Sequence, residues 1–123
     1  MGYYMYSRGS NFKFKEDVHT ELIVSAIKSL KGKLPWVTDE ELDSCNDDDL
    51  NKALNVCGWD YSEYAHSMDF IDEKSGGEDL LFENIARFVE DGSYIEMIGE
   101  DDYMWRWVFK SGTVREVTPN IIW

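Results

Sequence analysis

The spacing of apolar residues near the N-terminus is typical of β-strands. Tyr4 and Tyr6, and then Phe12 and Phe14, recur at every second position, which places them on one face of an extended chain. The intervening residues 8–10, Arg-Gly-Ser, are common in turns. The pattern predicts a hairpin with strands at residues 3–6 and 11–15.

The C-terminal third shows the same two-residue period. Residues 94–98, 103–110 and 113–117 alternate apolar and polar side chains, and the turn sequences Gly-Glu-Asp-Asp and Ser-Gly separate them. In the middle stretch Trp105 and Trp107 share one face, which predicts that this face points toward the core. We therefore expect a three-stranded antiparallel meander. Weaker patterns predict short strands at residues 64–71 and, after Pro119, at 120–123.

Apolar residues spaced three and four apart predict helices. The clearest of these covers residues 17–31, with Asp17 positioned to cap its start and Gly32 to end it. A second helix is predicted at about residues 78–90 and a shorter one at 49–56. Each has one apolar face that is suited to packing on a sheet.

Thr38 and Glu41 have the spacing of a capping box. In this motif each side chain accepts a hydrogen bond from the backbone N–H of the other residue, which satisfies two free donors at a helix start. A short helical turn is therefore predicted after Thr38.

The order of these elements predicts the fold class. Helices placed among antiparallel hairpins are typical of α+β proteins, in which the helices cover one face of a sheet. The chain has 123 residues, a length that suits one hydrophobic core. We expect residues 1–123 to form a single two-layer α+β domain, with two main helices packed on an antiparallel sheet that includes the C-terminal meander.

Two stretches of this C-terminal region resemble a known group of sequences. They are residues 81–96, which end in Gly-Ser-Tyr-Ile-Glu, and residues 99–109, which contain Gly-Glu-Asp and Trp-Arg-Trp-Val-Phe. The chain resembles a family of uncharacterised small proteins encoded in bacterial and phage genomes. This resemblance implies a phage or mobile-element origin and implies no activity, substrate or catalytic residue.

The charge of the chain is large and unevenly distributed. There are 25 acidic and 12 basic residues, which give a formal net charge of −13. Residues 34–102 hold 21 of the acidic residues and three basic ones, a net charge of −18, whereas the segments on either side are net positive. Direct binding to nucleic acid or to an anionic membrane requires a cationic face, so we expect neither partner.

The densest acidic run has seven carboxylates within eleven positions, at Asp39, Glu40, Glu41, Asp43, Asp47, Asp48 and Asp49. One interpretation is a solvated face with helix caps. Another is a surface that imitates the phosphates of DNA and docks in the basic groove of another protein. A calcium loop starting at Asp47 is the third, although Lys52 replaces the glycine, and Gly58 the glutamate, that such a loop needs.

The aromatic residues add to the second interpretation. The chain contains five Trp, seven Tyr and six Phe, which is more Tyr and Trp than a core of this size can enclose. Exposed Tyr and Trp beside acidic residues are typical of protein interfaces. We therefore assign Trp36 and Trp59, together with the acidic run, to a candidate partner-binding surface.

Motifs for catalysis or cofactor binding are missing from the sequence. It has no phosphate-binding glycine loop and no nucleophile elbow, and His19 and His66 are isolated from each other. Cys45 and Cys57 are twelve residues apart, which fits neither a zinc cluster nor a redox pair. We assign no catalytic residue, metal or cofactor, and the isolated thiols favour a cytoplasmic location.

These observations favour a small acidic, non-enzymatic module that binds a basic protein partner. A narrower hypothesis is a phage-encoded inhibitor of a basic nucleic-acid-binding protein of host defence, acting as a DNA mimic in the manner of an anti-CRISPR protein. Two alternatives stay open. One is a small metal-dependent enzyme or cation-binding protein with clustered carboxylates, and the other is a structural protein that self-associates through its edge strands.

Overall fold

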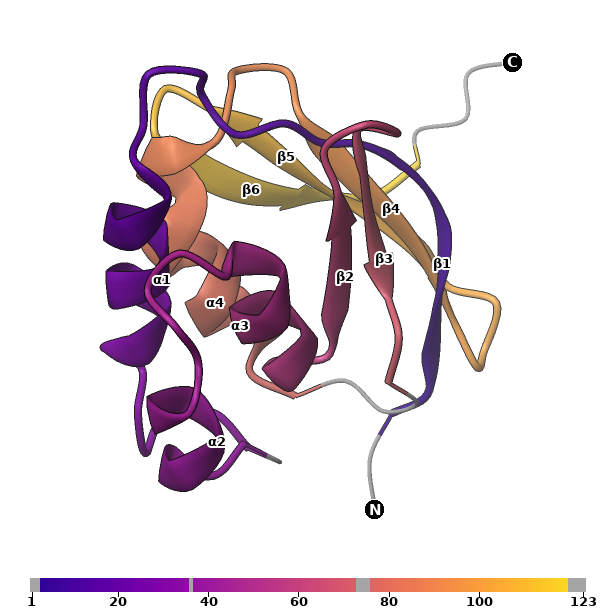
Figure 1. Cartoon of the computed structure of the whole chain (residues 1–123). Coiled ribbons are helices and arrows are strands. Elements are labelled where there is room, and N and C mark those ends of the chain that lie inside the picture. Colours follow the sequence, from indigo (N-terminus) through magenta and orange to yellow (C-terminus); the bar gives the residue numbers. More distant parts are fainter. Residues whose placement is uncertain (1–2, 36, 73–75, 120–123) are drawn as a thin grey trace.

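The computed structural model describes residues 3–35, 37–72 and 76–119. A four-stranded antiparallel sheet has the strand order β1-β4-β5-β6. Its strands are β1 (Met5–Asn11), β4 (Tyr94–Gly99), β5 (Met104–Lys110) and β6 (Thr113–Val117). Helices lie on one side of this sheet (Figure 1). The predicted α+β fold class is confirmed.

A second sheet is a hairpin of β2 (Trp59–Ser62) and β3 (Ser67–Phe70). It lies beside β1 in Figure 1, and two serine hydroxyls of β1 accept hydrogen bonds from the backbone of β3. Ser10 accepts a hydrogen bond from the Met68 N–H at 2.9 Å, and Ser7 accepts one from the Phe70 N–H at 2.7 Å. The prediction of a strand within residues 64–71 is confirmed in β3, whereas β2 was not predicted.

The predicted N-terminal hairpin is wrong. Residues 8–10 do not turn but continue β1 as a single strand, which pairs with β4 from Met5 opposite Gly99 to Asn11 opposite Tyr94. The register shifts between Ser7 and Gly9, so the Arg-Gly-Ser sequence forms a β-bulge. Beyond β1, residue 14 forms only an isolated bridge with residue 89.

The first helix, α1 (Thr20–Lys28), is shorter than predicted at both ends. His19 is its N-cap residue, so the prediction that Asp17 caps the helix is wrong. After Lys28 the backbone tightens through a bond from the Leu30 N–H to the Ile27 carbonyl at 3.0 Å. Gly32 then adopts a φ of +79°, a left-handed conformation that suits glycine at the end of a helix.

Three further helices follow. The predicted capping box is confirmed at α2 (Asp39–Asp43), because Thr38 and Glu41 make both reciprocal hydrogen bonds. The predicted helix at residues 49–56 is α3 (Leu50–Val56). The predicted helix at 78–90 is α4 (Glu78–Ile85), which ends in a 3₁₀ turn, η1 (Ala86–Phe88).

The predicted meander is confirmed as β4, β5 and β6, and the strand predicted at residues 120–123 lies outside the described residues. The side chains of Trp105, Trp107 and Phe109 are buried on the helix-covered face of β5, as their spacing predicts. Aromatic rings at the centre of the core pack edge to face, with Phe82 and Trp107 ring centroids 4.9 Å apart. Among the residues described, no helix has the length and apolarity needed to cross a membrane.

Candidate protein-interaction surface

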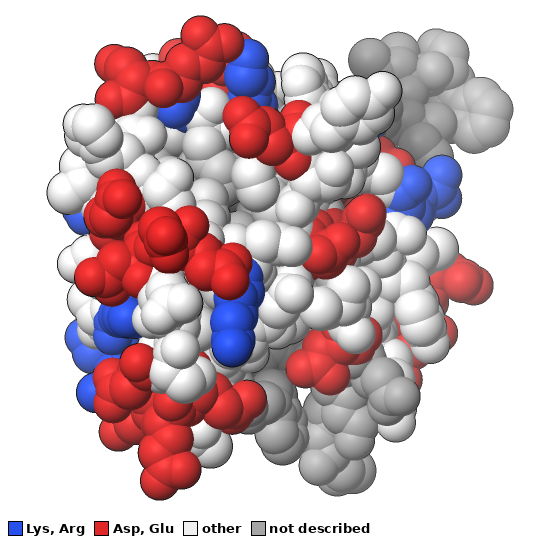
Figure 2. Space-filling view, viewed as in Figure 1, with Lys and Arg blue, Asp and Glu red and all other residues white. Residues whose placement is uncertain are grey.

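The predicted acidic run forms one exposed stretch of chain. We call residues 39–49 the acidic segment. It comprises α2, the loop that follows and the residue that caps α3, and all seven of its carboxylate side chains are exposed. Figure 2 shows one face of the molecule, with acidic side chains over its lower left, where Figure 1 places α2. Other acidic groups lie elsewhere on the same face, so the segment is one of several negative patches.

Two lysines, Lys28 at the last position of α1 and Lys31 in the turn after it, neutralise part of the segment. Lys28 Nζ lies 3.1 Å from Asp47 Oδ1, and it also donates to the Cys45 carbonyl at 2.6 Å. Lys31 Nζ lies 2.6 Å from Asp43 Oδ1, and its hydrogen bond to this carboxylate raises the pKa of the lysine. Asp43 and Asp47 are therefore already paired within the chain.

Two other carboxylates of the segment act as helix caps. Glu41 completes the capping box of α2, with its Oε1 accepting from the Thr38 N–H at 3.1 Å. Asp49 caps α3, with its Oδ1 accepting from the Lys52 N–H at 3.1 Å. Both interactions stabilise the helix starts, where backbone N–H groups lack partners.

Three carboxylates of the segment stay available. Asp39, Glu40 and Asp48 make no side-chain hydrogen bond or ion pair with any residue that the structure describes, and all three are exposed. The structure therefore divides the predicted acidic run into four residues with a local structural role and three that are free to meet a positively charged partner.

The prediction that Trp59 contributes to partner binding is wrong. Only 1% of its surface is exposed. Its ring packs against Phe70, with centroids 5.0 Å apart, and against Phe82 at the same distance. Trp59 is the first residue of β2, and the register of that strand turns its side chain into the core. Trp36, the other predicted tryptophan, lies outside the described residues.

Among the described residues, the exposed aromatic side chains are tyrosines, and Trp59 is not one of them. Tyr64 at the tip of the β2-β3 hairpin is 99% exposed, and Tyr103 before β5 is 50% exposed. Sequence analysis predicted that some rings must reach the surface, and these residues confirm it. Side-chain spacing alone did not identify which rings they are.

The residues of the candidate calcium loop are engaged elsewhere. Asp47 pairs with Lys28 and Asp49 caps α3, while Asn51 accepts a hydrogen bond from the Tyr61 N–H at 2.8 Å. Over the described parts of the chain, no group of three His, Cys, Asp or Glu side chains is placed to hold a metal ion. The geometry therefore gives the calcium interpretation no support.

The thiol of Cys57 is poorly suited to nucleophilic chemistry. Burial raises its pKa to about 12, so it is protonated at neutral pH and the reactive thiolate is scarce. Cys45 is buried, and both cysteines are free thiols.

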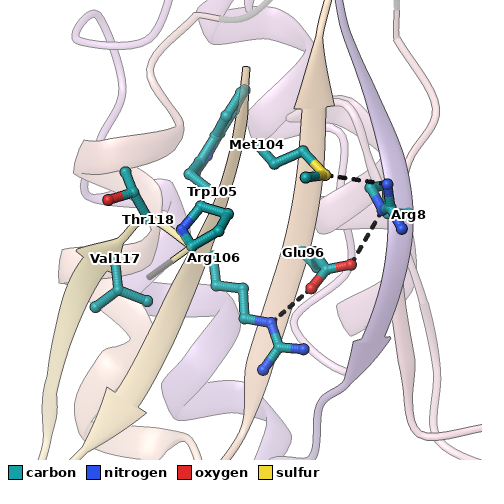
Figure 3. Close-up of a pocket in the computed structure, with 8 residues that line it drawn as sticks. Arg8, Glu96, Met104, Trp105, Arg106, Val117 and Thr118 are labelled. Atoms are coloured by element: carbon teal, nitrogen blue, oxygen red, sulfur yellow. Dashed lines mark hydrogen bonds and ion pairs between the residues drawn. The ribbon is translucent and has the colours of Figure 1, made fainter. Parts of the chain in front are cut away.

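A pocket of about 440 Å³ opens on the sheet face opposite the helices (Figure 3). Glu96 on β4 lies between two arginines, with its Oε1 2.7 Å from Arg106 Nε and its Oε2 3.1 Å from Arg8 Nε. The hydrogen bond from Arg106 is the main reason why the pKa of Glu96 is lowered. Both arginines share this one carboxylate, which already engages their guanidinium groups within the chain.

A second concave site has a different composition. A groove of about 350 Å³ lies between the start of α4 and the helix-covered face of β5 and β6. The described residues that line it are either acidic or aromatic, and none of them is a lysine or an arginine. We call it the acidic groove. Its four carboxylates are those of Glu78, Asp79, Asp101 and Glu116.

The rings of the acidic groove come from Tyr3, Tyr103, Trp105 and Trp107. Sequence analysis placed the two tryptophans in the core and did not identify the groove. The two-residue period did contain part of the signal, since it places Tyr103 on the same face as the tryptophans.

Comparisons with protein-family models, with curated proteins and with solved structures find no match to this chain. The resemblance of the C-terminal motifs to a bacterial and phage family stays a prediction.

Proposed function

We propose that the protein is a non-catalytic module that binds a positively charged surface of another protein through its acidic segment. The observation that carries this proposal is the exposed row of seven carboxylates at residues 39–49, of which only two form ion pairs with lysines that the structure describes. Uncompensated charges of one sign repel one another, and a cationic partner relieves that repulsion.

Electrostatic complementarity also predicts how such a complex forms. A strongly charged surface speeds association with an oppositely charged partner, and this effect falls as salt screens the charges. The partner is expected to be a basic protein, because an anionic surface of this kind repels nucleic acid.

The narrower form of the proposal is a phage-encoded inhibitor that occupies the nucleic-acid groove of a host defence protein. Spaced carboxylates on a short helix and loop support it, since they can take the place of phosphates against lysine and arginine side chains. The phage origin rests on the resemblance of the motifs at residues 81–96 and 99–109 to a bacterial and phage family.

Affinity capture from a bacterial lysate tests the proposal. The native chain is compared with the variant Asp39→Asn/Glu40→Gln/Asp48→Asn, which neutralises the three free carboxylates and leaves both helix caps in place. The matched control is Asp17→Asn/Glu63→Gln/Glu83→Gln, which removes the same charge from exposed positions elsewhere.

We expect the native chain and the control to capture the same basic proteins at low salt, and the acidic-segment variant to lose them. Raising the salt from about 50 to 300 mM should release the captured proteins from the native chain. Equal capture by all three chains, or capture that salt does not weaken, would show that the acidic segment is not the binding surface.

A further inference from the structure

The acidic groove concentrates negative charge in a partly enclosed place. Its carboxylates come from three elements: Glu78 and Asp79 start α4, Asp101 lies in the turn between β4 and β5, and Glu116 lies on β6. Among the residues that the structure describes, no lysine or arginine lines the groove to compensate them. Low-dielectric walls strengthen the field of such a cluster, so a cation is strongly favoured there.

Glu78 is partly buried, whereas the other three carboxylates of the groove are exposed. Burial raises its pKa, and the charges of Asp79 on the same helix and Glu116 on β6 raise it further. Its Oε2 accepts a hydrogen bond from the Gly76 N–H at 2.6 Å, which holds the carboxylate in place. A cation bound beside Glu78 would favour its ionised form.

The aromatic wall of the groove suits the same kind of ligand. The rings of Tyr103 and Trp105 stack with centroids 5.9 Å apart, and the Tyr3 ring lies 6.2 Å from Trp105. A lysine ammonium or an arginine guanidinium is attracted to the faces of such rings, and the attraction grows where water is excluded.

Tyr3 is held at the rim of the groove by two contacts. Its hydroxyl donates a hydrogen bond to Asp101 Oδ1, and this bond is the main reason why the pKa of Tyr3 is raised to about 12. Its ring also packs on Gly99, where a Cβ atom would collide with the tyrosine side chain. The close approach of the ring to β4 therefore requires glycine at position 99.

Two residues that line the groove carry buried donors, and these bear on a second feature of the ligand. Trp105 and Trp107 are only 6% and 3% exposed, yet their indole Nε1–H groups have no hydrogen-bond partner among the described residues. An unpartnered buried donor is costly, so an acceptor is expected to meet it. A simple cation offers no acceptor, whereas a peptide offers its backbone carbonyls.

We propose that the acidic groove binds a lysine or arginine side chain presented by a peptide segment of the basic partner, whose carbonyl oxygens accept hydrogen bonds from the indoles of Trp105 and Trp107. The inference rests on the proposed function, because it names a second contact of the same partner class. The volume of the groove lies at the lower end of the range for ligand sites, which suits one side chain and its adjoining backbone.

A titration followed by NMR tests the inference on the full ¹⁵N-labelled chain. The probes are a short glycine-serine peptide with one central lysine, matched peptides with arginine or N-acetyl-lysine at that position, and butylamine. The variants Trp105→Phe and Trp107→Phe assign the two indole N–H signals.

The lysine and arginine peptides should move both indole signals in a saturable way at millimolar concentration. The acetyl-lysine peptide, which lacks the charge, should leave them in place, and butylamine, which lacks carbonyl groups, should move them less than the lysine peptide does. The inference is overturned if both charged peptides fail to move the signals, or if either of the other two probes moves them equally.

Charge removal within the groove gives the second readout. The variant Glu78→Gln/Glu116→Gln should bind the lysine peptide about tenfold more weakly. If that variant loses the dispersed spectrum of a folded chain, Glu116→Gln alone serves, because Glu116 is exposed. Unchanged peptide affinity in a folded variant would overturn the inference.

The variant Asp39→Asn/Glu40→Gln/Asp48→Asn separates this inference from the proposed function. It should titrate with the lysine peptide as the native chain does. If the native chain shows no titration while this variant loses partner capture, the groove inference alone fails. If the titration is normal while the acidic-segment variant captures the partner as well as the native chain does, the proposed function alone fails.

Discussion

At the scale of the residue, Glu78 combines a binding position with an unfavourable electrostatic environment. Because its pKa is raised in the folded chain, the folded state holds a proton there more tightly than the unfolded state does. The resulting stability is fully present below the unfolded pKa, near 4.5, and it is lost as the pH rises through the raised folded pKa.

Glu78→Gln should therefore raise the melting temperature at pH 7, since it removes a strained charge and keeps an oxygen to accept from the Gly76 N–H. The gain should disappear at pH 4, where the native glutamate is protonated too. Thermal unfolding at the two pH values measures this, with Glu83→Gln on the exposed side of α4 as control. A lower melting temperature for Glu78→Gln at pH 7 would contradict the assignment.

The role of Trp59 is also decided at the scale of the residue, because it depends on where one side chain points. Trp59→Ala should lower the free energy of unfolding by about 3–5 kcal/mol, the usual cost of removing a large buried aromatic ring. Urea denaturation measures this loss. A change within about 0.5 kcal/mol, typical of surface substitutions, would return Trp59 to the list of candidate contact residues.

At the scale of the element, the turn that follows α1 and the acidic segment are electrostatically linked. Lys31→Gln breaks the ion pair with Asp43 and adds a free carboxylate to the segment. We expect the affinity for a basic partner to rise about two- to threefold, with little loss of stability because surface ion pairs contribute little.

Isothermal titration against the captured partner measures this effect of Lys31→Gln, and Lys110→Gln on β5 is the control with the same change in net charge. If both variants raise the affinity equally, only the net charge of the chain matters. If neither raises it, Asp43 does not face the partner.

Some elements were predictable from sequence because their signals are local. The period of two at residues 94–117 and the Thr38–Glu41 capping box each depend on residues close together in the chain. The Arg-Gly-Ser sequence at residues 8–10 indicates a turn as readily as a bulge, because turns and bulges use the same residue types. Whether this stretch turns or bulges depends on its pairing with β4, more than eighty residues away. The local sequence does not reveal that pairing.

The candidate sites differ in the same way. The acidic segment is contiguous, so its charge was visible in the sequence, although the pairing of Asp47 with Lys28 was not. The acidic groove unites Tyr3, Glu78, Asp101 and Glu116, which only the strand order of the main sheet and the docking of α4 bring together. The burial of Trp59 likewise depends on the register of β2.

At the scale of the whole molecule, we propose two contacts with one basic protein. The acidic segment would attract this partner, and the acidic groove would take one cationic side chain from it. Both depend on carboxylates becoming covered when the partner binds, and this can be measured residue by residue.

Carboxylate footprinting is the most direct measurement. Exposed carboxylates are labelled with a carbodiimide and glycine ethyl ester, with and without the captured partner, and the labelled positions are located by mass spectrometry. The account predicts that Asp39, Glu40 and Asp48 lose most of their labelling in the complex, while Asp17, Glu63 and Glu83 keep theirs. Unchanged labelling of the first three residues in a saturated complex would contradict it.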